Sequence, residues 1–322
     1  MAEGTEQRYH LPVLLDQTLD ALAVRPDGIY LDGTAGGGGH SFAIASRLTT
    51  GRLIALDRDP DAVAEAGRRL SGLPAEVVQA NFTEMGRVIA ERGIPGVDGV
   101  LLDVGVSSHQ LDDAARGFSY HKEAPLDMRM SQTGATAADL VNTLPEAELS
   151  GILFRFGEEK FARSIAREIL RRRAETPFAT TTQLAECVRD AVPAAYRRDG
   201  HPARKTFQAL RIAVNGELDC LSAALDTAFD CLNPGGRLAV ITFHSLEDRM
   251  VKQRFAAFCR GCVCPPDFPV CVCGRTPAAS PVLRKPAEAS PDELAVNPRS
   301  RSAKLRCVEK CHARYPGGEN AP

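Results

Sequence analysis

The feature that most constrains the fold is a regular alternation of short β-rich runs with helical stretches in the first third of the chain. The predicted strands cover residues 28–32, 52–56, 75–79 and 97–103. Helices are predicted at residues 40–48 and 60–70, and after Thr83, a residue that can cap a helix. Strands that alternate with helices in this way form a parallel sheet with helices on its faces.

The alternation stops after the fourth strand. From there the apolar periodicity is helical, as in Phe161, Ile165 and Ile169, which fall on one helix face. Helices are predicted at residues 145–156, 158–173, 182–192 and 203–214. The sheet pattern returns with a helix at 217–232, a turn at Pro234 and a strand at 237–243, after which Ser245 can cap a further helix.

These patterns predict an α/β fold with a doubly wound, mainly parallel sheet and an inserted all-helical domain. The sheet domain is expected to comprise residues 1–110 and 217–322, and the helical domain residues 111–216. Residues 276–298 are rich in Pro, Ala and Ser, so a loose surface excursion is expected there.

The sharpest motif is the run DGTAGGGGH at residues 32–40, between the first strand and its helix. Glycines permit positive φ and a close approach of ligand to backbone, although a tight turn alone would also use them. Asp57, at the end of the second strand, is placed to accept hydrogen bonds from ribose hydroxyls. Ligands of doubly wound sheets bind at this edge, outside the carboxyl ends of the strands.

Three nucleotide-site hypotheses follow from this edge. A P-loop is excluded because the chain has no GxxxxGK[ST] motif. A nicotinamide oxidoreductase stays open, since the glycines and Asp57 would serve NAD as well. Asp32, which precedes the glycines, favours the amino group of a methionine moiety instead. The polar elbow at residues 103–108 is where a methyl acceptor would enter.

At this point the chain resembles the bacterial 16S rRNA cytosine-N4 methyltransferases over nearly its whole length. The segments that carry the resemblance are DGTAGGGGH (32–40), LDRDP (56–60), LLDVGVSSHQLDDAARGFSY (101–120), PLDMRM (125–130), TFQALRIAVNGEL (206–218), PGGRLAVITFHSLEDR (234–249) and NPRSRSAKLR (297–306). The sequence departs from the family pattern at His109, often a proline, and at Lys205, where a threonine-arginine pair is more usual.

The resemblance implies a Rossmann-like class I methyltransferase fold with S-adenosyl-L-methionine as methyl donor. The acceptor would be a cytidine in the decoding region of 16S rRNA, in the small (30S) ribosomal subunit, and the location the cytoplasm. Carried over by position, the residues that contact the cofactor would be Gly38, Gly39, His40, Asp57, Phe82, Asp103 and Gln110. Phe82 would pack on the adenine face, and His40 would contribute a backbone contact at a helix N-terminus.

Cytosine's amino lone pair is delocalised into the ring, so an acceptor must draw on an amino hydrogen before the nitrogen can attack. Asp103, or a carbonyl of the elbow, is the candidate. Phe118 and Tyr120 are candidates for stacking on the base, or else for domain packing. His244, beside Ser245, points to the acceptor side, and the absence of GxSxG argues against a hydrolase.

Basic residues cluster in three segments that suit phosphate contacts. Arg163, Arg167 and Arg171 repeat at helical spacing, followed by Arg172 and Arg173. The other two clusters are Arg204, Lys205 and Arg211, and a C-terminal segment with Arg299 and Arg301. The net charge of −2 says little about partners, because proteins that bind nucleic acids often keep their basic residues in patches. The three clusters are therefore the feature that indicates an RNA partner. A catalytically silent RNA-binding module stays an alternative.

The segment GCVCPPDFPVCVCG at residues 261–274 holds two Cys-Val-Cys units around a proline-rich turn. In a hairpin, Cys262, Cys264, Cys271 and Cys273 would share one face, which suits a structural zinc ion. Cys259 could replace one ligand, and reduced thiols are the alternative. The polar N-terminus and the lack of a long apolar stretch predict no membrane association. Monomer and homodimer both stay open.

Overall fold

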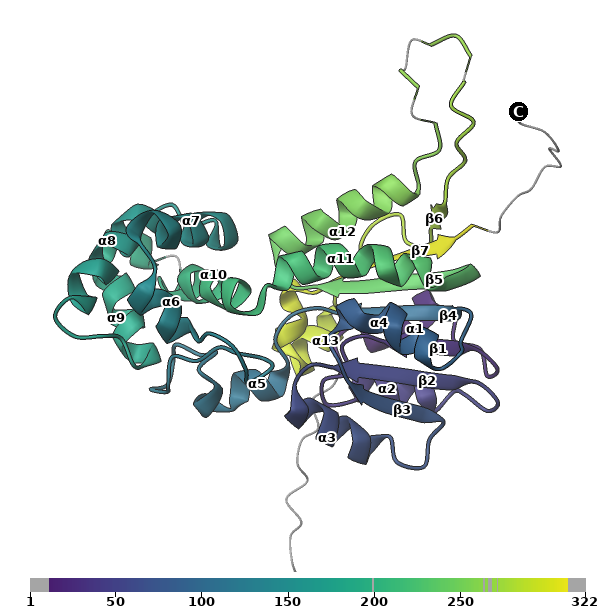
Figure 1. Ribbon diagram of the computed structural model, residues 1–322, viewed down its shortest axis with the longest axis horizontal. Coiled ribbons are helices and arrows are strands. Elements are labelled where there is room, and N and C mark those ends of the chain that lie inside the picture. Colours follow the sequence, from purple (N-terminus) through teal and green to yellow (C-terminus); the bar gives the residue numbers. More distant parts are fainter. Residues whose placement is uncertain (1–11, 199, 263, 266–267, 271, 312–322) are drawn as a thin grey trace, which may run out of the picture. The chain divides into compact units, whose positions relative to one another are not determined.

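The computed structural model describes residues 12–198, 200–262, 264–265, 268–270 and 272–311 (Figure 1). The chain forms two compact units. The sheet unit comprises the chain up to Gly105 and from Cys220 onward, and the helical unit is Val106–Asp219. No helix among the described residues has the length and apolar character needed to cross a bilayer.

A seven-stranded sheet runs through the sheet unit in the order β3-β2-β1-β4-β5-β7-β6. Its strands are β1 (Ile29–Asp32), β2 (Arg52–Asp57), β3 (Ala75–Gln79), β4 (Val97–Asp103), β5 (Leu232–Thr242), β6 (Ala279–Pro281) and β7 (Lys304–Lys310). The first five strands are parallel to one another, and β7 is antiparallel to both β5 and β6. This confirms the doubly wound, mainly parallel sheet.

Alternate residues of the strands enter two separate apolar cores, one on each sheet face. One face holds Leu31, Ile54 and Leu102 and packs against α4 (Met85–Glu91), α11 (Glu217–Asp230) and α12 (Ser245–Phe258). The opposite face holds Tyr30, Leu53 and Leu101. It packs against α1 (Leu15–Leu22), α2 (Gly39–Ala45) and α3 (Pro60–Arg69). The period of two along each strand therefore buries both faces of the sheet.

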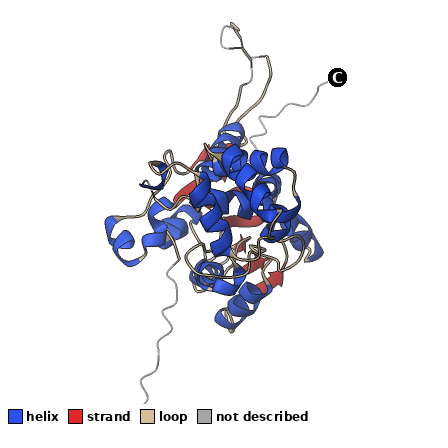
Figure 2. Ribbon diagram, turned by 90° about the vertical axis from the view of Figure 1, so that its left-hand side faces the viewer, coloured by secondary structure: helices blue, strands red, loops and turns tan. Residues whose placement is uncertain are grey.

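The helical unit has its own apolar core, which contains Ile165, Ile169 and Leu210. Its helices are α5 (Ser108–Asp112), α6 (Ala137–Thr143), α7 (Glu146–Gly157), α8 (Ala162–Arg173), α9 (Thr181–Ala191) and α10 (Arg204–Asn215), drawn in blue in Figure 2. At the end of α10 the Asn215 amide donates to the Met128 carbonyl at 2.7 Å and accepts from the Met130 N–H at 2.9 Å. This pair of bonds ties the long segment before α6 to the core.

The structure corrects two predicted helix caps. Asn81, not Thr83, caps the 3₁₀ turn η1 (Phe82–Glu84) that leads into α4, because its Oδ1 accepts from the Thr83 N–H. His244, not Ser245, caps α12 and forms a capping box with Glu247. A histidine ring nitrogen accepts from a backbone N–H as a serine oxygen does, so the sequence preference for serine placed the cap one residue late.

The loose excursion predicted at 276–298 is also wrong. This segment contains β6 and α13 (Pro291–Val296), and Ala287 pairs with Leu305. The Glu293 carboxylate accepts from the Leu14 N–H at 2.7 Å. The segment is ordered because it pairs with β7. The local amino-acid composition does not reveal that pairing.

Candidate active site

Three aspartates stand where three neighbouring strands end. Asp32 is the last residue of β1, Asp57 of β2 and Asp103 of β4. Since β1 lies between β2 and β4, all three reach the same edge of the sheet. The strand order reverses between β1 and β4, so this edge is the topological switch point at which such sheets bind ligands.

The glycine loop between β1 and α2 takes conformations and contacts that other residues tolerate poorly. Gly36 and Gly38 have φ of 50° and 76°. A Cβ atom on Gly39 would lie 2.6 Å from Pro12 Cγ, and one on Gly38 would lie 3.3 Å from Ala66 Cα. The loop therefore packs its own backbone against the fold while presenting N–H groups beside the strand ends.

Asp32 organises this loop from within. It is 1% exposed, its Oδ1 accepts from the Thr34 N–H at 3.0 Å, and its Oδ2 accepts from the Ser41 hydroxyl at 2.6 Å. Thr34 Oγ1 in turn accepts from the Asp103 N–H at 2.6 Å. Burial raises the pKa of the Asp32 carboxyl. Sequence reasoning expected Asp32 to face a ligand and missed this internal network.

Asp57 joins the loop to the second strand. Its Oδ2 accepts from the Gly36 N–H at 2.8 Å, and its Oδ1 accepts from the Asp59 N–H at 2.9 Å. Burial raises the pKa of the Asp57 carboxyl to about 6, more strongly than these two bonds lower it. Each oxygen keeps a second lone pair, so the carboxylate can still accept from a ligand.

Asp103 carries an unsatisfied acceptor. Its Oδ1 is buried and has no hydrogen-bond partner among the described residues, while its Oδ2 lies 3.4 Å from His40 Nδ1. Burial is the main cause that raises the pKa of the Asp103 carboxyl to about 6, and the nearby carboxylates of Asp32 and Glu247 raise it further. An unpaired buried oxygen is costly for the fold, so this one, at the ligand-binding edge of the sheet, is a candidate ligand position.

His40 is 7% exposed, and acceptors face both of its ring nitrogens. Nε2 lies 2.9 Å from the Val13 carbonyl oxygen, which can only accept, so Nε2 carries a hydrogen. Nδ1 faces Asp103 Oδ2 at 3.4 Å. The sequence predicted only a backbone contact for His40, because nothing in the local pattern indicates the pairing with β4.

Phe82 and Gly105 flank these strand ends. Phe82 follows β3, is half-buried, and packs partly against the core. A Cβ on Gly33 would lie 3.1 Å from Phe82 Cβ, so the loop and this ring are close neighbours. Gly105 has φ of 126°, and a Cβ there would lie 3.3 Å from the Phe243 ring. The elbow after β4 therefore requires a glycine.

His244 follows β5 and contacts Glu247. His244 Nε2 lies 3.0 Å from Glu247 Oε1, and Glu247 Oε2 accepts from the Phe243 N–H at 2.9 Å. Glu247 is 2% exposed. His244 thus has a structural function at the start of α12, as a cap, in addition to its predicted place on the acceptor side.

The residues predicted in the helical unit lie in different environments. Gln110 is 5% exposed and forms a capping box with Ser107 at the start of α5. Phe118 is buried in the core of the unit, which favours the packing alternative over base stacking. Tyr120 is half-buried and stacks on His201, with ring centroids 4.3 Å apart. Lys205 donates to the Glu158 carbonyl at 3.1 Å, at the end of α7.

Many of the predicted phosphate-binding arginines are in ion pairs. Arg171 and Arg172 both contact Glu168 at 2.8 Å, and Arg172 also contacts Asp190 at 2.8 Å. In the same way Arg211 pairs with Glu217 at 2.8 Å. Such pairs leave less positive charge available to RNA than the sequence suggested. The side chains of Arg204 in α10 and of Arg299 and Arg301 in η4 (Pro298–Ser302) are exposed.

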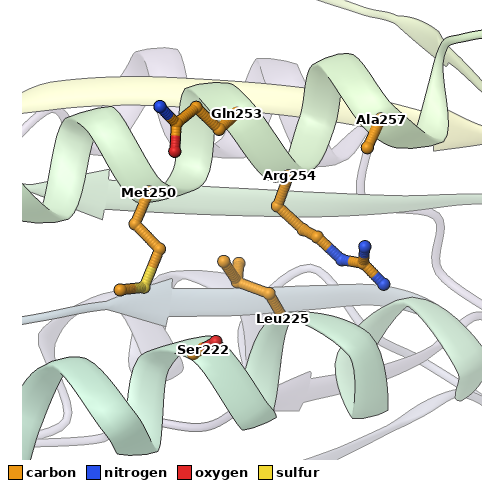
Figure 3. A pocket seen from close by; sticks show the side chains of 6 residues that line it. All are labelled: Ser222, Leu225, Met250, Gln253, Arg254 and Ala257. Atoms are coloured by element: carbon orange, nitrogen blue, oxygen red, sulfur yellow. The ribbon is translucent and has the colours of Figure 1, made fainter.

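Three of the four predicted zinc ligands lie together. The Sγ atoms of Cys262, Cys264 and Cys273 are all within 4.8 Å of one another. Cys271, the fourth predicted ligand, lies outside the described residues. A separate shallow pocket of about 280 Å³ lies between α11 and α12, lined by Ser222, Leu225, Met250, Gln253, Arg254 and Ala257 (Figure 3). None of the strand-end carboxylates lines it.

The chain is similar to known proteins over almost its whole length. Residues 7–311 match the model of the MraW methylase family. A ribosomal RNA small subunit methyltransferase H from Heliobacterium modesticaldum is 55% identical over 308 residues, which cover 94% of this chain and 98% of that protein. One of the same description from Symbiobacterium thermophilum is 54% identical over 310 residues, covering 95% and 98%. A solved rRNA methylase from Streptococcus thermophilus aligns with a TM-score of 0.43 at 11% identity, over 94% of this chain and 100% of that one.

Proposed function

Since this chain belongs to the MraW methylase family, we propose that it transfers the methyl group of S-adenosyl-L-methionine to a cytidine of 16S rRNA. The acceptor atom is the exocyclic N4 amine of cytosine 1402 in the small ribosomal subunit. The relatives' description as ribosomal RNA small subunit methyltransferases supports the substrate class. A ribosomal substrate implies that the protein acts in the cytoplasm.

The observation that carries the proposal is the edge where Asp32, Asp57 and Asp103 meet the glycine loop. Two of these carboxyls have a pKa raised to about 6, and one of their oxygens is an orphan. A ligand that donates hydrogen bonds at this edge would give partners to the buried carboxylate oxygens, whose burial otherwise costs folding free energy. S-adenosyl-L-methionine donates through its ribose hydroxyls and its ammonium group, so the residues present fit it.

Each predicted cofactor residue has a part that matches its chemistry. Asp57 accepts from the ribose hydroxyls, as its remaining lone pairs allow. Gly38 and Gly39 bring the backbone at the start of α2 close to the ligand, and Phe82 packs on the adenine. Gln110, in the helical unit, is proposed as a further contact from the family resemblance alone.

The cofactor supplies an electrophilic methyl group, and the chain must place the amine in line with it. Positioning of this kind lowers a barrier by roughly 7–11 kcal/mol. We assign Asp103 Oδ1 as the acceptor for an amino hydrogen, because it is a buried carboxylate oxygen at the strand ends that has no hydrogen-bond partner among the described residues. His40 is a positioning residue, because its Nδ1 lies 3.4 Å from Oδ2 of the Asp103 carboxyl.

The RNA contacts follow from the exposed basic residues and one aromatic residue. Arg299 and Arg301 in the sheet unit, and Arg204 and Lys205 in the helical unit, suit backbone phosphates. Tyr120 is the better candidate for base stacking, since Phe118 is buried. The proposal for His244 is a contact to the acceptor nucleotide in addition to its capping of α12.

The test is a radiolabelled methyl-transfer assay on small ribosomal subunits from a strain that lacks this protein. We expect label in one cytidine of 16S rRNA and none in subunits from the parent strain. Calorimetry with S-adenosyl-L-methionine and with NAD accompanies it. Binding of NAD alone would establish the oxidoreductase alternative. Binding of the donor and RNA without label transfer would establish a silent RNA-binding module. Either result overturns the proposal.

A further inference from the structure

The described part of the hairpin between α12 and β6, residues 259–262, 264–265, 268–270 and 272–278, projects from the sheet unit in both views (Figures 1 and 2). Its large apolar side chains are exposed. Phe268, Val270 and Val272 are 51%, 69% and 73% exposed. A segment that buries so little apolar surface needs another constraint to hold one conformation. We call this segment the cysteine hairpin.

The sulfur atoms of the cysteine hairpin have the spacing of metal ligands. Cys262 Sγ and Cys273 Sγ are 3.7 Å apart, and Cys264 Sγ completes a triangle with every side within 4.8 Å. Zn–S bonds of about 2.3 Å in a tetrahedron place two sulfurs about 3.8 Å apart. A disulfide would join only two of the three sulfurs, at about 2.05 Å. The triangle therefore matches a shared ion better than a covalent pair.

A backbone hydrogen bond supports the same assignment. The Cys264 N–H donates to Cys262 Sγ at 3.3 Å, across the Cys-x-Cys unit. A bond from an N–H to a sulfur stabilises the thiolate, which is the form that binds a metal. It also orients the first sulfur toward the second, so the local backbone prepares the site before an ion arrives.

We infer that Cys262, Cys264 and Cys273 bind a structural zinc ion that fixes the cysteine hairpin. Soft thiolates at tetrahedral spacing select zinc over harder cations such as magnesium and calcium. The sulfur atoms of these three described residues carry the inference. The ion replaces the apolar core that the hairpin lacks.

The position of the hairpin makes the zinc structural rather than catalytic. α12 begins at Ser245, beside the carboxyl end of β5, and ends at Phe258, where the hairpin starts. Its fourteen residues span about 21 Å at 1.5 Å per residue. The zinc site therefore lies at the opposite end of this helix from the strand-end carboxylates, and its loss should leave donor binding unchanged.

The first test is metal analysis of the full-length protein, purified under reducing conditions without chelators. We expect about one zinc ion per chain. Cys262→Ser and Cys273→Ser should each lose most of it, while Cys220→Ser should retain it. Cys220 is a matched control, since this half-buried thiol lies near Asn81 and outside the hairpin. Calorimetry with S-adenosyl-L-methionine reports whether each variant is folded.

A second measurement needs no variant. Cobalt added to the metal-free protein should give the strong thiolate charge-transfer band of a tetrahedral sulfur site. Removal of the metal should speed proteolytic cleavage within residues 259–278. Reduced, folded protein with neither zinc nor a cobalt spectrum would overturn the inference. So would the same metal content in the Cys262→Ser, Cys273→Ser and Cys220→Ser variants.

Discussion

The buried strand-end carboxyls of the sheet unit and the Glu168 carboxyl of the helical unit are held in opposite ways. In the helical unit Glu168 lies between Arg171 and Arg172, and these hydrogen bonds lower the pKa of its carboxyl to about 2. In the sheet unit the described partners of Asp57 are backbone N–H groups, and Asp103 Oδ2 lies 3.4 Å from the His40 ring. Burial raises the pKa of both carboxyls to about 6.

A carboxylate with a lowered pKa contributes to folding stability, whereas a buried carboxylate with a raised pKa lowers folding stability when it is ionised. A carboxyl whose folded pKa lies above its unfolded value destabilises the protein above about pH 6. That penalty disappears as the pH falls toward 4. For Asp103 the shift corresponds to roughly 3 kcal/mol. A group retained against such a penalty is a candidate for function, whereas Glu168 needs no function beyond its ion pairs.

The largest expected effect is on catalysis at Asp103. Asp103→Ala and Asp103→Asn remove the anionic acceptor for the amino hydrogen, so kcat for methyl transfer should fall by about 10²–10⁴-fold. The measurement is label transfer to small subunits at saturating donor, with donor affinity determined in parallel. A loss of donor binding alone, with normal kcat, would assign Asp103 to cofactor binding. Near-normal turnover in both variants would refute its part in the chemistry.

The next effect is the pH dependence of donor binding. Asp57 accepts most strongly from ribose hydroxyls when it is ionised, and its pKa is about 6. Affinity should therefore fall by up to about tenfold between pH 7 and pH 5, as the ionised fraction falls. Asp57→Asn should weaken binding by about tenfold or more at pH 7, as the loss of charge-assisted bonds predicts, and should flatten the profile. Calorimetry from pH 5 to 8 measures both. If donor affinity depended on pH in Asp57→Asn as it does in the native protein, a group other than Asp57 would cause that dependence.

The first four strands and the mainly parallel sheet could be predicted from sequence, because the patterns that indicate them are local. The glycine run at 32–40 and the aspartates that end the strands are each visible within a few residues. The strand and helix periods placed β1 to β4 within a residue or two of their observed bounds. The predicted helices at 145–156 and 203–214 match α7 and α10 equally closely.

What the sequence could not show depends on contacts between distant segments. The pairing of His40 with Asp103 joins residues 63 positions apart. β7 was missed because its basic residues suggested an RNA-binding segment. Two of them have structural partners: Arg306 pairs with Asp248 at 2.7 Å, and Lys310 donates to the Leu232 carbonyl at 2.8 Å. Charge along a sequence does not reveal which cations the fold itself uses.

The third prediction addresses the cations that remain exposed. Arg299→Ala and Arg301→Ala should each weaken RNA binding several-fold, because each removes a candidate phosphate contact. The slope of log affinity against log salt should become shallower by about one per lost contact. Binding of S-adenosyl-L-methionine serves as the control and should not change. Arg171→Ala, which removes an ion-paired arginine, should alter RNA affinity less. Equal loss of RNA and donor binding at Arg299 and Arg301 would contradict the assignment.

The smallest expected effect is on stability in the helical unit. Glu168→Gln removes both ion pairs. Because Arg171 is 57% exposed and Glu168 is 23% exposed, solvent screens them, and the loss should be below about 1 kcal/mol at pH 7. Glu186→Gln, an exposed change in α9, is the charge-matched control.

A lowered pKa contributes stability above the unfolded value near pH 4, and this contribution is lost as the pH falls toward 2. The urea midpoints of native protein and Glu168→Gln should therefore converge over that interval. Donor binding should be the same in both. A Glu168→Gln variant that kept its stability but lost methyl transfer would contradict this distinction. It would show that a carboxylate with a lowered pKa also takes part in function.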